Sequence, residues 1–191
     1  MQEVYVTDQT FHKNNFTQNR LAKGEYENCI FKVCDFSNCD LSGYKFLECE
    51  FIDSNLSLTK LNKTALQSIK FRDCKLMGLH FYTCNDFGLS FTFDNCILNH
   101  SSFYRMKLKK TSFKNSQLQE TDFTECDLSN SVFDNCDLAK AMFENSILEK
   151  VDFRSSFNYI IDPETNRIKK ARFSLPGVTG LLAKYDIEID N

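Results

Sequence analysis

The sequence predicts an all-β solenoid, a tube built from short extended steps, because large apolar residues recur every five residues along most of the chain. In the first series, Phe, Leu or Tyr occupies every fifth position from Phe11 to Phe81; a second series runs from Phe93 to Phe153 and alternates Phe with Leu. A period of five fits neither an amphipathic helix nor a plain strand, but it fits a short extended step followed by a corner. A repeat unit this small buries its apolar side only against neighbouring units, so the array folds as one body.

The second observation is that the residue two positions before each of these centres is usually small. Alternate residues of an extended segment point to the same side, so this residue and the centre are expected to face the interior. The cysteines occupy one phase of the repeat as far as Cys84, and a phase shifted by two residues from Cys96; all but Cys84 stand two residues before a centre. All nine are predicted to be packing residues of the interior: Cys29, Cys34, Cys39, Cys49, Cys74, Cys84, Cys96, Cys126 and Cys136.

Zinc binding and disulfide bonding are the two other uses considered for these cysteines. Zinc ligands usually come in pairs two to four residues apart, whereas Cys29, Cys34 and Cys39 are spaced by five and would lie on successive walls of the tube. The number of cysteines is odd, and stacked pairs such as Cys29 and Cys49 rarely meet disulfide geometry. Reduced thiols and no metal site are therefore expected, and a cytoplasmic location fits them.

The first interruption of the repeat lies between Phe81 and Phe93, which are twelve residues apart instead of ten. This register break falls near residues 82–92, and Phe87 is the natural centre if each of two repeats gained one residue. A bulge that the coil absorbs is the favoured interpretation. A bent hinge or a protruding contact is the alternative.

The pattern loosens again after Phe153. Phe173 returns in phase twenty residues later, so residues 154–173 are predicted to form an irregular last coil and residues 1–173 one solenoid. Residues 174–191 are predicted to form a helix after Pro176 and a short strand at Asp186–Ile189. Because the open end of a solenoid needs covering, this segment is interpreted as a cap.

Four segments share the order small residue, Asp or Asn, Leu: Cys39-Asp40-Leu41, Ser54-Asn55-Leu56, Cys126-Asp127-Leu128 and Cys136-Asp137-Leu138. They resemble the consensus of the pentapeptide-repeat family, and the resemblance covers roughly residues 11–153. It implies a right-handed quadrilateral parallel β-helix with four repeats per coil and about seven coils. Residues twenty apart would then stack in ladders along the rod.

The C-terminal segment resembles, by residue type and position, the helix and strand that join two copies in the quinolone-resistance members of the family, the Qnr and MfpA types. The resemblance implies a homodimer. Its interface would contain Leu181, Leu182, Tyr185, Ile187 and Ile189. A cap that packs only within its own chain is the alternative.

The net charge of −3 hides three bands of opposite sign along the rod. Residues 25–53 hold seven acids and two lysines, residues 54–118 hold ten basic residues and three acids, and residues 119–153 hold nine acids and two lysines. The nine acids of the last band are Glu120, Asp122, Glu125, Asp127, Asp134, Asp137, Glu144, Glu149 and Asp152.

The Qnr and MfpA resemblance implies a use for these nine acids. An outer surface that imitates DNA would bind the DNA-binding surface of a type II topoisomerase, either DNA gyrase or topoisomerase IV, and would modulate the enzyme or protect it from quinolones. Attraction between opposite charges would steer such an association. Two features depart from the pattern, namely the basic middle band and the lack of a long projecting loop.

Other functions are weighed against this one. His12, His80 and His100 have no nucleophile or base beside them in a known motif, and no glycine-rich phosphate-binding motif occurs, so no enzyme activity, catalytic residue or cofactor is predicted. No stretch approaches the length of a membrane span. A β-helical scaffold for another protein is the main alternative. Direct nucleic-acid binding is also considered, through Lys107, Lys109, Lys110 and Lys114, and the flanking acidity disfavours it.

Overall fold

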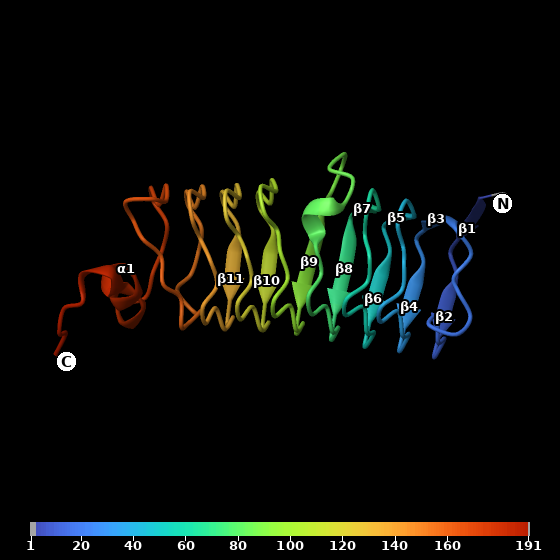
Figure 1. Cartoon of the computed structure of the whole chain (residues 1–191), viewed down its shortest axis with the longest axis horizontal. Coiled ribbons are helices and arrows are strands. Elements are labelled where there is room, and N and C mark those ends of the chain that lie inside the picture. Colours follow the sequence, from blue (N-terminus) through green and yellow to red (C-terminus); the bar gives the residue numbers. More distant parts are fainter. Residues whose placement is uncertain (1–2, 191) are drawn as a thin grey trace.

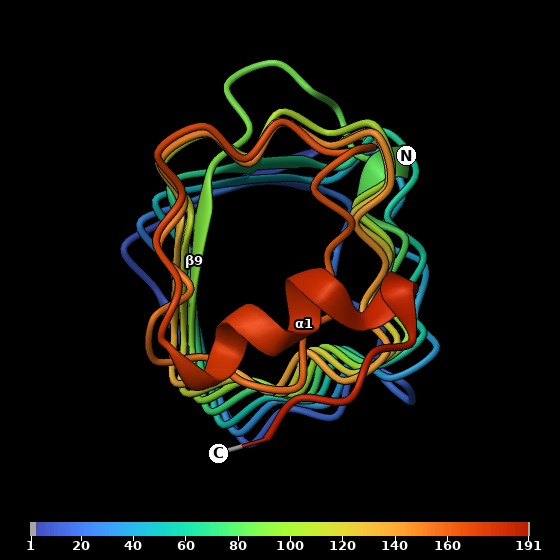
Figure 2. The same ribbon diagram turned by 90° about the vertical axis from the view of Figure 1, so that its left-hand side faces the viewer.

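The computed structural model describes residues 3–190 and shows a rod of stacked coils (Figure 1) with a four-sided cross-section (Figure 2). The strands are β1 (Val4–Thr7), β2 (Thr10–His12), β3 (Gly24–Glu27), β4 (Ile30–Lys32), β5 (Lys45–Leu47), β6 (Glu50–Ile52), β7 (Ala65–Gln67), β8 (Ile69–Arg72), β9 (Phe91–Asp94), β10 (Ser112–Lys114) and β11 (Val132–Asp134). One wall is a seven-stranded sheet in the order β11-β10-β9-β8-β6-β4-β2, one strand per coil, and the preceding wall carries the sheet β1-β3-β5-β7. All their pairings are parallel, which confirms the predicted β-helix of about seven coils.

The interior of the tube is filled by the centres of the repeat. Every centre from Phe16 to Phe81 and from Phe93 to Phe153 is buried. Residues one coil apart stack, and the rings of Phe113 and Phe133 lie nearly parallel with their centroids 4.7 Å apart. Burial of each such side chain stabilises the fold by roughly 1.5 to 3 kcal/mol, so the ladders supply the main driving force.

Where the residue two positions before a centre is Cys, Ser or Thr, it often has a second task, which is to donate a hydrogen bond inside the wall. The hydroxyl of Ser131 donates to the carbonyl oxygen of Leu108 at 2.7 Å, and the thiol of Cys136 reaches the carbonyl oxygen of Phe113 at 3.4 Å. Seven cysteines are buried, Cys39 and Cys84 are half-buried, and all nine are free thiols. A small side chain with a donor therefore suits this position, because an unpaired buried polar group is costly.

The corner of most repeats lies two residues after the centre, where the backbone takes a left-handed conformation. Asn38 has a φ of 58° there, and even the branched side chains of Val33 and Leu58 are held at 55° and 59°. Asn tolerates this conformation well, whereas a β-branched residue is strained in it. The corners explain why the chain turns after every five residues.

The two extra residues of the register break leave the wall as a loop. Ala65 pairs with Asn85 and Ile69 pairs with Phe91, so residues 86–90 stand where a regular coil would need only three residues. The chain projects there beyond the outline of the other coils (Figure 2). The break is therefore a protruding loop rather than an absorbed bulge. The pairings of Asn85 and Phe91 keep the wall regular on both sides, so the extra residues between them extend outward.

Phe87 is not the centre at the break, contrary to the prediction. Its side chain is 78% exposed, and the half-buried Leu89 packs against the core instead. The surplus residues push Phe87 out of the wall, while the return to β9 brings Leu89 back toward the interior. A single turn of 3-10 helix, η1 (Phe81–Thr83), precedes the loop.

Short helices cover the C-terminal end of the tube: η2 (Pro176–Val178), α1 (Thr179–Leu182) and η3 (Ala183–Tyr185). They lie across the last coil (Figure 2), and Gly180 approaches the backbone of Tyr159 so closely that a side chain at that position would clash. The predicted strand at Asp186–Ile189 is not formed. A strand needs a neighbour to exchange backbone hydrogen bonds with, and residues 3–190 of one chain offer none there.

Candidate functional surfaces

The nine acids of residues 119–153 are spread around the rod rather than gathered on one face. Asp134 lies on β11. Three other aspartates lie elsewhere around the coil and form β-bridges with the preceding coil: Asp122 with Ser102, Asp127 with Lys107, and Asp137 with Gln117. Each repeat points its centre inward and its neighbouring residues outward. Any surface that approaches this part of the rod from the side therefore meets several carboxylates.

Five of these acids are neutralised by nearby basic residues. The ion pairs are Glu120 with Lys140 (3.7 Å), Glu125 with Arg105 (2.7 Å), Asp127 with Lys109 (3.1 Å), Glu149 with Arg167 (2.7 Å), and Asp152 with Arg154 (2.7 Å) and Arg172 (3.5 Å). The imidazole of His100 also lies 3.3 Å from the carboxylate of Glu120. Several partners stand twenty residues away, one coil along the rod. Exposed pairs of this kind stabilise by only about 0 to 1 kcal/mol, but they reduce the negative charge that a partner would meet.

The other four, Asp122, Asp134, Asp137 and Glu144, have no ion pair within residues 3–190, and we call them the uncompensated acids. Three of them accept hydrogen bonds only from neutral groups. Ser102 donates to Asp122 at 3.0 Å and Ser155 donates to Asp134 at 2.8 Å. Gln119 donates to Asp137 at 2.7 Å. The uncompensated acids carry the negative charge of this surface most fully.

Hydrogen bonds keep key carboxylates ionised. Partial burial by itself would raise the pKa of Asp137, but donors from Gln119, Asn158 and the backbone of Ala139 outweigh it and hold that pKa below its ordinary value. The pKa of Glu125 is likewise lowered, chiefly by the hydrogen bonds from Arg105. Both carboxylates are therefore charged at neutral pH.

The five residues predicted for a dimer interface lie together at the C-terminal end of the rod. Leu181 and Leu182 are half-buried against the last coil, whereas Tyr185, Ile187 and Ile189 are each about half exposed. Lys184 binds Asp162 at 2.8 Å and Glu164 at 2.6 Å, which anchors the helices to the last coil. The chain beyond Tyr185 thus presents apolar side chains that its own tube does not cover.

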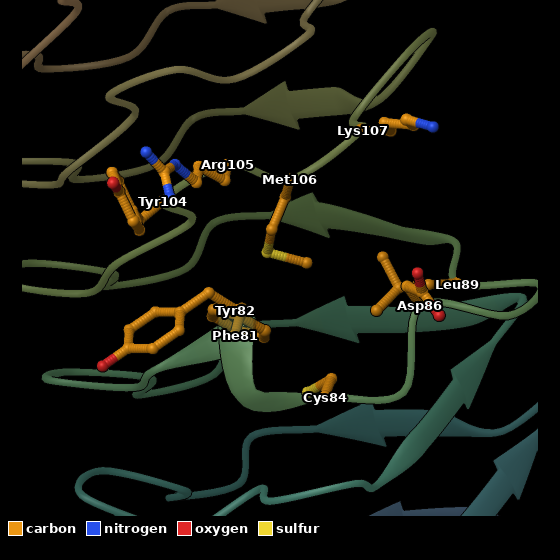
Figure 3. Close-up of a pocket in the computed structure, with 9 residues that line it drawn as sticks. All are labelled: Phe81, Tyr82, Cys84, Asp86, Leu89, Tyr104, Arg105, Met106 and Lys107. Atoms are coloured by element: carbon orange, nitrogen blue, oxygen red, sulfur yellow. The ribbon is translucent and has the colours of Figure 1, made fainter.

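A surface that the sequence did not reveal lies beside the protruding loop. A cavity of about 530 Å³ opens between the coil of η1 and the next coil, and we call it the break groove. Its lining residues are Phe81, Tyr82, Cys84, Asp86, Leu89, Tyr104, Arg105, Met106 and Lys107. Met106 extends toward Phe81 and Cys84 in the coil below, and Lys107 points away to the outside (Figure 3).

A second cavity of about 300 Å³ continues on the other side of Leu89, and we call it the lysine groove. Its lining residues are Ser68, Ile69, Lys70, Leu89, Ser90, Phe91, Thr92, Lys107, Leu108, Lys109, Lys110 and Thr111. The twelve-residue spacing between Phe81 and Phe93 and the change of phase between Cys84 and Cys96 were the signals in the sequence that pointed to this region. The grooves themselves depend on which way the loop leans, and spacing does not indicate that.

A family model described as a pentapeptide repeat region matches residues 24–92 and 89–157. Together the two matches cover more than half of the chain. The chain belongs to the pentapeptide-repeat family. The matched residues extend from β3 through the register break to the irregular last coil, so the family repeat accounts for most of the rod.

Several solved structures match most of this chain at low sequence identity. Trypsin-treated QnrB1, described as a plasmid-mediated fluoroquinolone resistance protein, is 19% identical over 98% of this chain and 100% of its own, with a TM-score of 0.46. Full-length QnrB1 is 20% identical over 96% and 100%, with a TM-score of 0.37. HetL of the cyanobacterium Nostoc, described as involved in heterocyst differentiation regulation, is 14% identical over 87% and 86%, with a TM-score of 0.37. The comparison with curated protein sequences finds no match.

Within residues 3–190, no three or more His, Cys, Asp or Glu side chains gather in a way that could hold a metal ion. The same part of the chain has no helix long and apolar enough to cross a membrane.

Proposed function

We propose that this pentapeptide-repeat protein is a non-catalytic, DNA-mimicking protein that binds a type II topoisomerase such as DNA gyrase and modulates it or protects it from quinolones. The observation that carries the proposal is the distribution of the uncompensated acids, Asp122, Asp134, Asp137 and Glu144, around a straight rod. Regularly placed negative charge on a rod is the property of a DNA duplex that a basic DNA-binding surface recognises.

The contact is confined to the C-terminal coils in this proposal. Residues 54–118 carry ten basic residues against three acids, and a basic enzyme surface would repel them. Residues 119–153 carry nine acids against two lysines. If two copies join through their C-terminal ends, the acidic coils of both copies become neighbours and form one longer acidic stretch.

A supercoiling assay with gyrase from the same host tests the proposal, with and without a quinolone. We expect the protein to change supercoiling at micromolar concentration or below, because complementary charge speeds association. The informative variant is Asp134→Asn with Glu144→Gln, which removes two uncompensated acids and keeps their shape. It should require at least about tenfold more protein for the same effect.

The matched control is Glu48→Gln with Asp53→Asn, which removes two exposed acids from the N-terminal acidic band. The control should keep wild-type activity within about twofold. Inertness of the wild-type protein against its host's gyrase would rule the proposal out. Equal losses in both double variants would show that net charge matters and the acidic coils do not.

A scaffold that binds another protein is the second candidate, and the break groove favours it. Tyr82 is exposed on its rim, and Met106 extends across it. Aromatic and methionine side chains are common at protein interfaces. Recovery of one non-topoisomerase partner whose binding is lost with Tyr82→Ala would favour the scaffold over the topoisomerase binder.

A further inference from the structure

The protruding loop leaves one strand edge of the tube wall without a backbone partner. In the next coil, the N–H of Asp127 donates to the carbonyl oxygen of Met106 at 2.9 Å, and the carbonyl oxygen of Asp127 accepts from the N–H of Leu108 at 2.7 Å. The carbonyl oxygen of Ser129 likewise accepts from the N–H of Lys110 at 3.0 Å. The groups that correspond to these three one coil earlier are the N–H and carbonyl of Lys107 and the carbonyl of Lys109. Within residues 3–190 these three groups have no hydrogen-bond partner, and we call them the open edge.

The open edge exists because the loop bonds only to the coil that precedes it. The N–H of Ser90 donates to the carbonyl oxygen of Leu66 at 3.0 Å, and the hydroxyl of Ser90 accepts from the N–H of Ser68 at 2.9 Å. The amide of Gln67 donates to the carbonyl oxygen of Phe87 at 3.1 Å. All three bonds draw the loop toward β7 and away from Lys107.

The two grooves run along the open edge and give access to it. Leu89 and Lys107 line both of them, so the break groove and the lysine groove meet at the unpaired residue. Their volumes, about 530 and 300 Å³, lie in the range of ordinary ligand sites. An extended chain of a few residues can occupy this space.

The charge along the open edge is positive. Lys70, Lys107 and Lys110 have no ion pair in the described part of the chain. Arg105 and Lys109 bind acids of the following coil. Asp86 is an acid that lines the break groove, and the residues that line the lysine groove include no acid. A segment with carboxylates would be attracted to this edge, and a basic segment would be repelled.

We propose that the open edge binds an extended acidic segment of a partner protein, which adds to the wall as a parallel strand. The added strand would donate two N–H groups to the carbonyls of Lys107 and Lys109, and accept one hydrogen bond from the N–H of Lys107. Addition of a strand to an exposed sheet edge is a general mode of peptide recognition. This site lies outside the acidic coils and does not depend on the topoisomerase proposal.

Strand register defines the sequence that fits. Lys107 and Lys109 both point outward, so the residues of an added strand beside them also point outward, two positions apart. Acids at these two positions face the lysines, and the residue between them faces Leu89. The occupant therefore has the pattern acid, apolar residue, acid.

A second copy of this chain carries the same pattern in its tail, Asp186-Ile187-Glu188. In our prediction that tail stays at the C-terminal end of the rod, where Ile187 and Ile189 belong to the dimer interface. A tail engaged in that interface is not available to an open edge. The occupant of the open edge is therefore a segment of a separate partner protein.

Fluorescence anisotropy with a labelled seven-residue peptide that alternates valine and glutamate tests the site on the full chain. We expect binding that weakens as salt is added, and slower exchange of the Lys107 amide proton in NMR spectra when the peptide is bound. A copy of the peptide with methylated backbone nitrogens cannot pair with an edge and should bind at least about tenfold more weakly. A peptide that alternates valine and lysine should not bind.

Two protein variants locate the site. Lys107→Glu with Lys110→Glu should weaken peptide binding at least about tenfold. Lys150→Glu with Lys170→Glu is the matched control, because both residues take the position of Lys110 in later coils of the same wall. The control should bind within about twofold of the wild-type protein.

Four outcomes would overturn the proposal. Equal binding of the methylated peptide would show that the backbone edge is not used, and equal losses in both double variants would show nonspecific charge attraction. Tighter binding of a single-stranded oligonucleotide, lost with Lys107→Glu and Lys110→Glu, would assign the edge to nucleic acid. Self-association that the same variant abolishes would assign it to a second copy.

Discussion

At the scale of the residue, the position two before each centre explains why so many cysteines occur in a chain without disulfides. Burial raises the pKa of the Cys136 thiol to about 11 and that of Cys126 to about 12, so both stay protonated at neutral pH. A protonated thiol is small, apolar and able to donate weakly to a carbonyl. Cys, Ser and Thr are interchangeable here because each provides bulk and a donor.

Substitution of Cys136 tests this interpretation. Cys136→Ser should fold with nearly native stability, because Ser156 and Ser116 hold the same position one coil on either side. Cys136→Arg places an unpaired charge inside the tube and should abolish folding. Circular dichroism and solubility distinguish the two variants, and a soluble, native-like Cys136→Arg protein would refute the inward orientation.

A second residue-scale prediction concerns the strained corner at Val33. Its φ of 55° is unfavourable for a β-branched residue, so Val33→Asn should raise the free energy of unfolding by about 1 kcal/mol. Val132 is the matched control, because both side chains are 41% exposed but Val132 lies in β11. Urea denaturation should show no gain for Val132→Asn; equal gains in both would exclude relief of corner strain.

At the scale of the element, the two large apolar residues of the loop at residues 86–90 differ in their contacts with the tube. Leu89 packs on the core, whereas Phe87 is 78% exposed. The loop is thus tied to the tube by Leu89 and by its hydrogen bonds to β7. A loop fixed in this way keeps the open edge accessible.

Alanine substitutions should separate these two roles. Leu89→Ala should lower the free energy of unfolding by about 1 to 2 kcal/mol, since a half-buried leucine loses contacts with the core. Phe87→Ala should change it by less than about 0.5 kcal/mol, as exposed substitutions usually do. Chemical denaturation measures both, and a larger loss for Phe87→Ala would mean that the loop packs differently in solution.

At the scale of the whole molecule, the rod divides into an acidic, a basic and an acidic band, and stacking brings the bands into contact. Arg105 and Lys109 of the basic band bind acids one coil further on. The charge that a partner meets is therefore smaller than the composition of the acidic coils suggests. It resides mainly in Asp122, Asp134, Asp137 and Glu144.

The C-terminal tail carries the whole-molecule prediction. Because Ile187 and Ile189 are exposed and lie in no strand among the described residues, we predict a homodimer whose interface they share with Leu181, Leu182 and Tyr185. Ile187→Arg with Ile189→Arg should therefore reduce the mass seen by light scattering to that of one chain. Leu175→Arg, at a side chain 88% exposed outside this set, is the control and should leave the mass unchanged. A wild-type protein that is already monomeric would contradict the prediction.

Much of the fold could be predicted because the five-residue period specifies which side chains face inward. This holds for each coil regardless of the sequence of the coil that stacks on it. The centres from Phe16 to Phe153 were located in this way. Phe87 was misplaced because spacing cannot show which of several apolar residues returns to the core after an insertion. The strand at Asp186–Ile189 was predicted from alternation alone, but alternation creates no strand without a neighbour to bond to.

By itself the sequence determined the period, the inward residues, the position of the break and the order of the charged bands, because these are properties of spacing along the chain. Only the tertiary structure decided which acids are neutralised, where the loop leans and which backbone groups it leaves unpaired. Those outcomes depend on contacts between residues about twenty apart in neighbouring coils. They also depend on which of the two adjacent coils the loop forms hydrogen bonds with.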